Sequence, residues 1–339
     1  MKFNPKQKIY VLCETGALGD TIATFPTLKI LSDRGHIEKM FVDERYLDLY
    51  RVVFPDHLIV RLKDAMTTIP RAQVTQDIPR SVINPQTGDA CFLSYPIDPR
   101  IPVVHTMSQN GLTAIHASLV DGFSATITNS ILKEWEKDYP RVVKSKLPDN
   151  PLPLNDRPYA VIAYGATTEH RKMLPEAFVG IRDFLIRNNY HVVLLGKRDH
   201  QLSVMGGGTL TAPSFEGIDT TGCVDLLDKT TVLEALSIMS DAKVVIGVDG
   251  GLIHLAGMTD TAIVAGFTTV DPYYRPIYRH GIKNWRMQLV EPTSECLYCQ
   301  TNTFATYGIN FHICNTGTKE CMNSLTADSW IRRLVAAGL

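Results

Sequence analysis

Residues 244–257 read VVIGVDGGLIHLAG, an apolar run followed by Asp249, two glycines and a second apolar segment. A short β-branched run of this kind predicts a buried strand over 244–248, and the segment behind it predicts a helix that starts within 250–257. Glycines at the turn let the backbone pass close to a ligand, and the first free N–H groups of a helix attract anions. The stretch therefore predicts a strand–turn–helix unit of an α/β fold, with an anion site at the turn.

Strands and helices alternate in the same way on both sides of this stretch. The pattern predicts strands over 159–164, 191–195 and 262–267 and helices over 176–187 and 232–240 in the second half of the chain, and strands over 8–13, 39–42 and 58–62 with helices over 21–31 and 44–53 in the first half. Such alternation is typical of a parallel, doubly wound sheet. We therefore expect an α/β protein with two Rossmann-like domains and a cleft between them.

Residues 147–158 separate the two halves. They read LPDNPLPLNDRP, and four prolines in twelve residues suit an extended linker better than a helix or a strand. This boundary predicts a first domain over 1–150 and a second over 151–325, followed by a helix within 326–339 that is expected to pack back on the first domain. In the first domain, residues 63–110 contain six prolines, which predict loops.

The composition is that of a globular protein with no strong overall field. The chain has 339 residues, enough for two domains, and its 34 Lys and Arg balance 35 Asp and Glu, unlike a protein that holds nucleic acid by phosphate neutralisation alone. The most apolar region, 244–267, is interrupted by Asp249, His254 and Asp260, so no membrane-spanning segment is expected. The apolar run over 9–13 is too short for a signal-peptide core, which predicts a cytoplasmic protein.

The turn at Gly250 and Gly251 suits a diphosphate. In this interpretation Asp249 lies near sugar hydroxyls, and His254, one turn into the helix, adds a hydrogen-bond donor. The alternative is an ordinary strand-to-helix turn in which Asp249 is the N-cap.

Two further loops follow predicted strands and carry candidate side chains. After the strand over 159–164 come Thr167, Thr168 and Lys172, whose hydroxyls and ammonium can bind phosphate oxygens; the alternative is a solvated surface lysine. After the first strand comes Asp20, at a helix start. Its carboxylate can act as a general base toward an attacking hydroxyl, and the alternative is an N-cap role. The loop before Asp20 lacks the Gly-x-Gly-x-x-Gly pattern of dinucleotide-binding proteins.

Four of the seven cysteines lie close together near the C-terminus: Cys296, Cys299, Cys314 and Cys321. One Cys-x-x-Cys pair and two later thiols can supply four ligands to a single tetrahedral zinc or iron ion. A site with four protein ligands has no open position, so the predicted role is structural. Free thiols or a disulfide are the alternatives.

The order and spacing of these segments resemble glycosyltransferase family 9, the ADP-heptose heptosyltransferase family, over nearly the whole chain. The resemblance rests on GDTIATFP at 19–26, ATT at 166–168 with Lys172 and Pro175, Asp225-Leu226 through Thr231 and Leu233, IGVDGG at 246–251 followed by HLA at 254–256, Thr268-Thr269-x-Asp271-Pro272 with Pro276, and the four cysteines. Gly250 stands where the family usually has Thr.

The resemblance implies a GT-B fold in which the first domain binds the acceptor and the second binds a nucleotide sugar, ADP-heptose by default. It also implies transfer with inversion, no catalytic metal, and Asp20 as the base. The acceptor is open between a glycan, a protein and a modified nucleic acid, and the sequence does not indicate an oligomeric state. The alternatives are a nucleotide-sugar epimerase of the same architecture and a metal-stabilised binding module without enzymatic activity.

Overall fold

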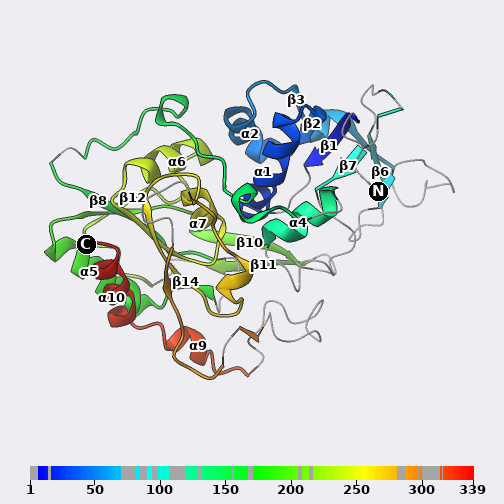
Figure 1. The fold of residues 1–339 in the computed structure, drawn as a ribbon. Coiled ribbons are helices and arrows are strands. Elements are labelled where there is room, and N and C mark those ends of the chain that lie inside the picture. The colour runs from blue at the N-terminus through cyan, green and yellow to red at the C-terminus, as the bar shows by residue number, and fades with distance from the viewer. Residues whose placement is uncertain are drawn as a thin grey trace.

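Two lobes lie side by side in the computed structural model, each built on its own parallel sheet (Figure 1). The structure describes residues 7–13, 17–69, 81–83, 90–93, 98, 100–101, 103–106, 119–128, 131–154, 156–166, 171–204, 208–213, 217–280, 287–296, 298–299, 314 and 316–339. No helix among these is long and apolar enough to cross a membrane.

The first lobe is organised around a four-stranded parallel sheet in the order β3-β2-β1-β7. Its elements are β1 (Ile9–Cys13), α1 (Leu18–Asp33), β2 (Ile37–Val42), η1 (Glu44–Tyr46), α2 (Leu47–Val53), β3 (Ile59–Arg61), α3 (Leu62–Ala65), β7 (Val103–His105) and α4 (Leu119–Thr128). The predicted strands and helices of this half are confirmed. Only the start of the first helix differs much, because α1 begins at Leu18 rather than residue 21.

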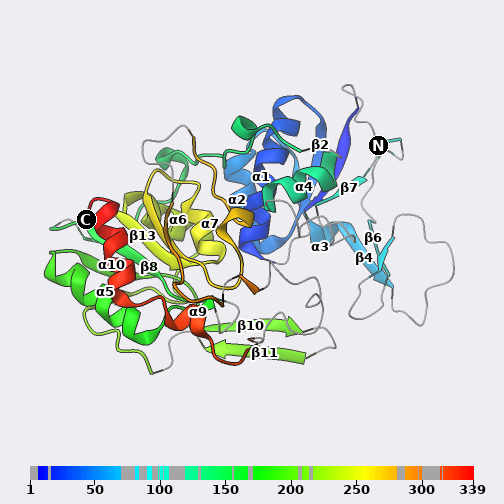
Figure 2. The same ribbon diagram turned by 60° about the horizontal axis from the view of Figure 1, so that its bottom comes forward.

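The expectation of loops over 63–110 was wrong. Strands β4 (Met66–Ile69), β5 (Ser81–Ile83) and β6 (Ala90–Leu93) form an antiparallel sheet in the order β4-β6-β5, and Figure 2 shows this part of the chain projecting from the first lobe. None of these three strands contains a proline. Proline blocks a long element, whereas strands of three or four residues fit between prolines.

The second lobe carries a six-stranded parallel sheet in the order β12-β9-β8-β13-β14-β15. Its strands are β8 (Tyr159–Ala163), β9 (His191–Leu194), β12 (Cys223–Asp225), β13 (Val244–Val248), β14 (Ala262–Gly266) and β15 (Gln288–Val290), and a hairpin of β10 (Asp199–Val204) and β11 (Gly208–Pro213) projects from the lobe. Numbered by their appearance in this sheet, the strands run 3-2-1-4-5-6. That order is the doubly wound topology of dinucleotide-binding folds, so the predicted fold is confirmed.

Helices cover both faces of the second sheet. They are α5 (Pro175–Arg187) and α10 (Ala327–Ala336) on one face and α6 (Val232–Asp241) and α7 (Gly251–Ala256) on the other. The structure also has the short helix α9 (Glu320–Asn323) and the 3₁₀ turns η4 (Glu134–Glu136), which contacts α1, η5 (Lys144–Lys146) and η7 (Pro272–Tyr274). Successive strand residues therefore point into two different apolar clusters, as Val161 and Ile162 do. The cluster that contains Val161 continues into the first lobe through Val11 and Phe25, so the two lobes share an apolar core.

The terminal helix does not return to the first lobe, contrary to our expectation. Helix α10 packs on α5, β14 and β15 of the second lobe (Figure 1). Its apolar stripe includes Trp330, which is fully buried, and a Cβ at Gly266 would lie only 2.6 Å from the Trp330 ring. The burial of this stripe in the second lobe explains why the helix stays there.

Candidate active site

The predicted site loops lie where the strand order of each sheet reverses. In the second lobe this point is between β8 and β13, and their carboxyl ends lead into the loops that contain Lys172 and Asp249. In the first lobe it is between β1 and β7, and β1 leads into α1 and Asp20. Ligands of open α/β sheets bind at such points, outside the carboxyl ends of the strands.

Asp249 forms a buried ion pair at the end of β13. Its Oδ2 lies 3.1 Å from Nη1 of Arg171, and the two side chains are only 6% and 14% exposed. Burial alone would raise the pKa of Asp249, but Arg171, Arg275 and His254 outweigh it, and the pKa is lowered. The N-cap alternative is wrong, because Gly250 caps α7 and no side chain accepts a hydrogen bond there.

The two glycines of the turn have different environments. A Cβ at Gly251 would lie 2.9 Å from Cβ of Leu18 and 3.2 Å from the backbone nitrogen of Gly19, whereas a Cβ at Gly250 would lie 3.5 Å from its nearest neighbour, the carbonyl oxygen of Val248. The start of α7 therefore touches the start of α1 across the two lobes. Only Gly251 is required by this close approach, and Gly250 leaves room for a side chain.

His254 lies on α7 with 5% of its surface exposed. Its Nδ1 lies 2.7 Å from the hydroxyl of Tyr139, a residue of the segment that joins the lobes. Burial lowers the pKa of His254 to about 4, although the neighbouring Asp249 opposes the shift. The imidazole is therefore neutral near pH 7, and any contact with phosphate is that of a neutral donor.

Asp20 lies in the first turn of α1, and the N-cap of this helix is Ala17, so the N-cap alternative for Asp20 is wrong as well. Burial raises the pKa of Asp20. Arg275 lowers it, Asp249 raises it further and Arg171 lowers it, with a raised value as the result. These interactions place Asp20 within electrostatic reach of the charged groups of the second lobe. A carboxylate with a raised pKa is a stronger proton acceptor once it is ionised.

Sequence reasoning missed Arg171, Arg275 and Tyr139. Arg171 immediately precedes the predicted Lys172, and this adjacency is the one signal that pointed to it. Arg275 follows η7 and Tyr139 lies in the inter-lobe segment, and neither belongs to a recognisable local pattern. Of the predicted phosphate ligands, Lys172 is partly buried in the loop before α5. Thr167 and Thr168 lie outside the described residues.

The four clustered cysteines occupy one region without converging on a common point. The pKa of Cys321 is raised to about 11, mainly by burial, with smaller contributions from Cys296, Cys299 and Cys314. The Sγ of Cys314 lies 3.5 Å from the hydroxyl of Thr316. Among the described residues, no three Cys, His, Asp or Glu side chains are placed to hold one metal ion. The donors suit a metal, but their arrangement here does not complete a site.

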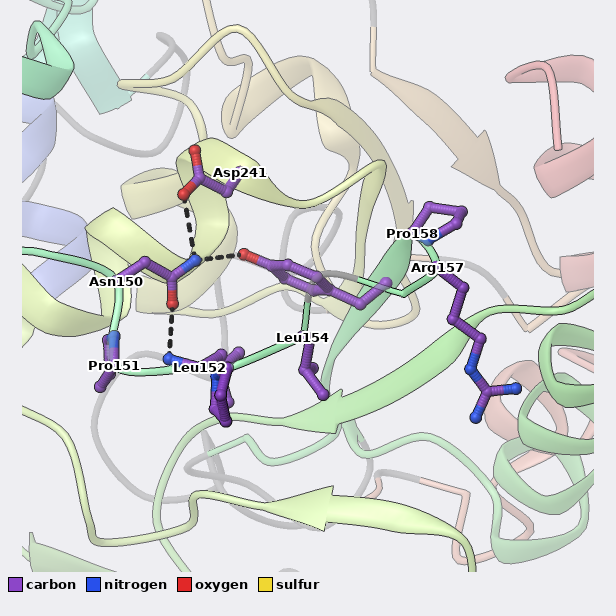
Figure 3. A pocket seen from close by; sticks show the side chains of 9 residues that line it. Asn150, Pro151, Leu152, Leu154, Arg157, Pro158 and Asp241 are labelled. Carbon is purple, nitrogen blue, oxygen red and sulfur yellow. Dashed lines mark hydrogen bonds between the residues drawn. The ribbon is translucent and has the colours of Figure 1, made fainter.

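A hollow of about 540 Å³ lies elsewhere on the second lobe, lined by Asn150, Pro151, Leu152, Pro153, Leu154, Arg157, Pro158, Tyr159 and Asp241 (Figure 3). It borders the amino end of β8, the edge of the sheet opposite to Asp249. The side-chain amide of Asn150 donates to the Tyr159 hydroxyl at 2.9 Å and to Asp241 at 3.0 Å. Because the hollow lies at the opposite end of the strands from the candidate site, it is not part of that site.

Comparison with known families and structures gives a consistent result. The model of glycosyltransferase family 9 (heptosyltransferase) matches residues 115–303, more than half of the chain. No match was found among curated protein sequences.

Three solved structures share the fold over almost all of the chain. The iron-containing dodecameric glycosyltransferase TibC from enterotoxigenic E. coli is 16% identical with a TM-score of 0.69, and the match covers 98% of this chain and 76% of TibC. A family 9 glycosyl transferase from Veillonella parvula is 14% identical with a TM-score of 0.64, and the match covers 99% of this chain and 98% of that one. The E. coli heptosyltransferase WaaC with ADP is 14% identical with a TM-score of 0.57, and the match covers 98% of this chain and 100% of WaaC.

Proposed function

Because this chain belongs to glycosyltransferase family 9, we propose that it transfers a sugar, heptose from ADP-heptose by default, to an acceptor hydroxyl with inversion and without a catalytic metal. The observation that carries the proposal is the close contact between the start of α1, which carries Asp20, and Gly251 in the turn that follows Asp249. The choice of donor is supported by TibC, solved in complex with ADP-D-beta-D-heptose, and by WaaC, solved with ADP.

In this proposal the second lobe holds the donor. The diphosphate lies at the Gly250–Gly251 turn, with Lys172, Thr167 and Thr168 as further ligands. Asp249 orients Arg171 through their buried contact. The guanidinium then faces the diphosphate as a fixed positive group, which stabilises negative charge that develops there.

The first lobe supplies the base. Asp20 takes the proton of the acceptor hydroxyl, the acceptor oxygen forms a bond to the anomeric carbon, and the bond from that carbon to the diphosphate oxygen breaks. Its electron pair leaves with the diphosphate, where Lys172, Arg171 and Arg275 balance the charge. Attack from the face opposite to the leaving group inverts the anomeric centre.

The test compares Asp20→Asn with Asp48→Asn. Asp48 is a control carboxylate of the same lobe, exposed on α2 and paired with Arg51. We expect Asp20→Asn to lower transfer by about 10²- to 10⁴-fold while calorimetric ADP-heptose affinity is retained, because general bases contribute about that much. Transfer at the wild-type rate by Asp20→Asn would refute its role as the base.

A second experiment identifies the substrates. A thermal-shift screen of ADP-, UDP-, GDP- and CDP-sugars selects the donor, and mass spectrometry of candidate glycans, proteins and modified nucleic acids then detects the product. Release of nucleoside diphosphate only in the presence of acceptor distinguishes transfer from epimerisation. Membership of an enzyme family argues against the binding module without activity.

A structural zinc or iron ion at Cys296, Cys299, Cys314 and Cys321 is part of the same proposal. The thiol donors and the iron in the name of TibC support it, whereas the arrangement of the four side chains does not. We derive no step of the reaction through this ion. The cytoplasmic location and the domain limits 1–150, 151–325 and 326–339 likewise remain proposals.

A further inference from the structure

His254 lies in a narrow space between the two lobes. The ring of Tyr139 lies beside it, with centroids 6.0 Å apart and planes at 27°. The Cδ2 edge faces α1, where a Cβ at Gly19 would lie 3.0 Å away. The next ring atom toward α1 is Cγ, 3.6 Å from that Cβ. Nε2, on the other side of Cδ2, is the ring nitrogen that does not bond to Tyr139.

Tyr139 is held firmly in place. Its backbone N–H donates to the carbonyl of Tyr278 at 3.0 Å, and its ring packs so closely on α7 that a Cβ at Gly257 would lie 3.0 Å from Cδ2. Only 2% of the residue is exposed, and burial raises the pKa of its hydroxyl. The hydroxyl therefore keeps its proton and has a fixed position 2.7 Å from Nδ1 of His254.

A neutral imidazole carries one N–H donor and one acceptor nitrogen, and the hydrogen bond made by one nitrogen fixes the role of the other. A buried hydroxyl is costly unless its proton reaches an acceptor, and the structure places Nδ1 there. With Nδ1 as the acceptor, the single proton of the neutral imidazole lies on Nε2.

We propose that Tyr139 is a positioning residue whose hydroxyl donates to Nδ1 of His254 and so keeps the imidazole proton on Nε2, where it is presented to the donor diphosphate. The second half of this statement rests on the proposed function, and the first half does not. The segment between the lobes thereby sets the protonation pattern of a residue on the donor-binding helix. Tyr139→Phe keeps the aromatic ring and removes only the hydroxyl.

The test records ¹⁵N spectra of histidine-labelled protein near pH 7, with the His254 signals assigned by their loss in His254→Gln. We expect a pyridine-type signal for Nδ1 and a pyrrole-type signal for Nε2 in the wild type, and a mixture of tautomers in Tyr139→Phe. The control is Tyr159→Phe, which removes another buried hydroxyl, one that donates to the carbonyl of Ile238 at 2.6 Å at the amino end of β8. It should leave the His254 signals unchanged.

Calorimetry with ADP tests the functional half. Loss of one hydrogen bond predicts that Tyr139→Phe binds ADP about 2- to 10-fold more weakly than the wild type. Tyr159→Phe should bind ADP as the wild type does. A wild-type His254 protonated on Nδ1 overturns the proposal, even if no variant folds. Unchanged ADP affinity of folded Tyr139→Phe overturns the presentation to the diphosphate. If the wild type shows the Nε2–H tautomer but does not bind ADP, the proposed donor is wrong while the tautomer assignment stands.

Discussion

Substitution of Gly251 by alanine tests whether the two lobes meet as the structure shows. The new methyl group would lie 2.9 Å from Cβ of Leu18 and 3.2 Å from the backbone nitrogen of Gly19. Carbon atoms are best separated by about 3.5–4.0 Å, so the starts of α1 and α7 must move apart by at least ~0.6 Å. One of the two contacts is with backbone, which cannot rotate away as a flexible side chain can.

The size of the effect follows from these distances. Overpacking of a close contact costs about 1–3 kcal/mol, and this cost destabilises only the state in which the two lobes are in contact. Alanine is favoured over glycine in a helix by up to about 1 kcal/mol, and this gain is the same whether the lobes touch or separate. Touching lobes are therefore disfavoured by about 5- to 150-fold, while the stability of the second lobe is retained.

The assay is ADP release from ADP-heptose, with thermal unfolding measured beside it. We expect Gly251→Ala to lose about 5- to 150-fold in kcat/KM without a lower melting temperature. Gly250→Ala should lose less, because its methyl group would be 3.5 Å from the nearest atom. Gly180→Ala is the opposite control: its Cβ would lie 2.5 Å from Cβ of Ala327, between α5 and α10, so it should lower the melting temperature and spare kcat/KM. Wild-type ADP release by Gly251→Ala would refute the reasoning.

Four further outcomes are expected. Arg171→Gln leaves the buried carboxylate of Asp249 unpaired and should lower the free energy of unfolding at pH 7 by about 3–5 kcal/mol in denaturant titrations. Because the folded-state pKa of Asp249 is lowered, the ionised Asp249 stabilises the fold at pH values above the ordinary carboxyl pKa. The difference in unfolding free energy between the wild type and Arg171→Gln should therefore shrink as the pH falls below about 4. A difference that stays constant with pH would contradict the ion pair. The raised pKa of Asp20 predicts that transfer falls with decreasing pH at values above the usual aspartate range, and a pH–rate profile without this limb contradicts its role as a base. Trp330→Ala should cost about 3–5 kcal/mol of unfolding free energy, since the ring is fully buried, and a loss below about 1 kcal/mol would show that α10 packs differently. Cys321→Ser should reduce the zinc or iron found by elemental analysis, and wild-type protein without near-stoichiometric metal would exclude the metal proposal.

Features set by local interactions could be predicted from the sequence, and features set by long-range contacts could not. Strands β8 and β13 could be read from the sequence because their apolar runs are continuous, as strands buried on both faces require. Helix α6 could be predicted in the same way, since Thr231 and Glu234 form a capping box within four residues. Each of these patterns depends only on neighbouring residues, so it can be recognised without knowing the tertiary fold.

The sheet of β4, β5 and β6 was missed for the same reason. Its strands are three or four residues long, too short for a periodic pattern, and the prolines between them gave the stronger local signal. The terminal helix was predicted, but its packing on α5, β14 and β15 was not. An amphipathic pattern shows that one face of a helix is buried, and it does not show which elements cover that face.

The sequence by itself determined the α/β fold, the two halves and the loops that follow β1, β8 and β13. Hydrophobic periodicity and glycine turns are patterns of a few consecutive residues, so they can be recognised in the sequence alone. Only the tertiary structure decided which side chains meet. Arg171 reaches Asp249 across 78 residues, and Tyr139 reaches His254 across 115. Such pairs depend on how the strands are ordered in a sheet and how one lobe is seated on the other. Their geometry is fixed by the packing of the shared core, which no local pattern encodes.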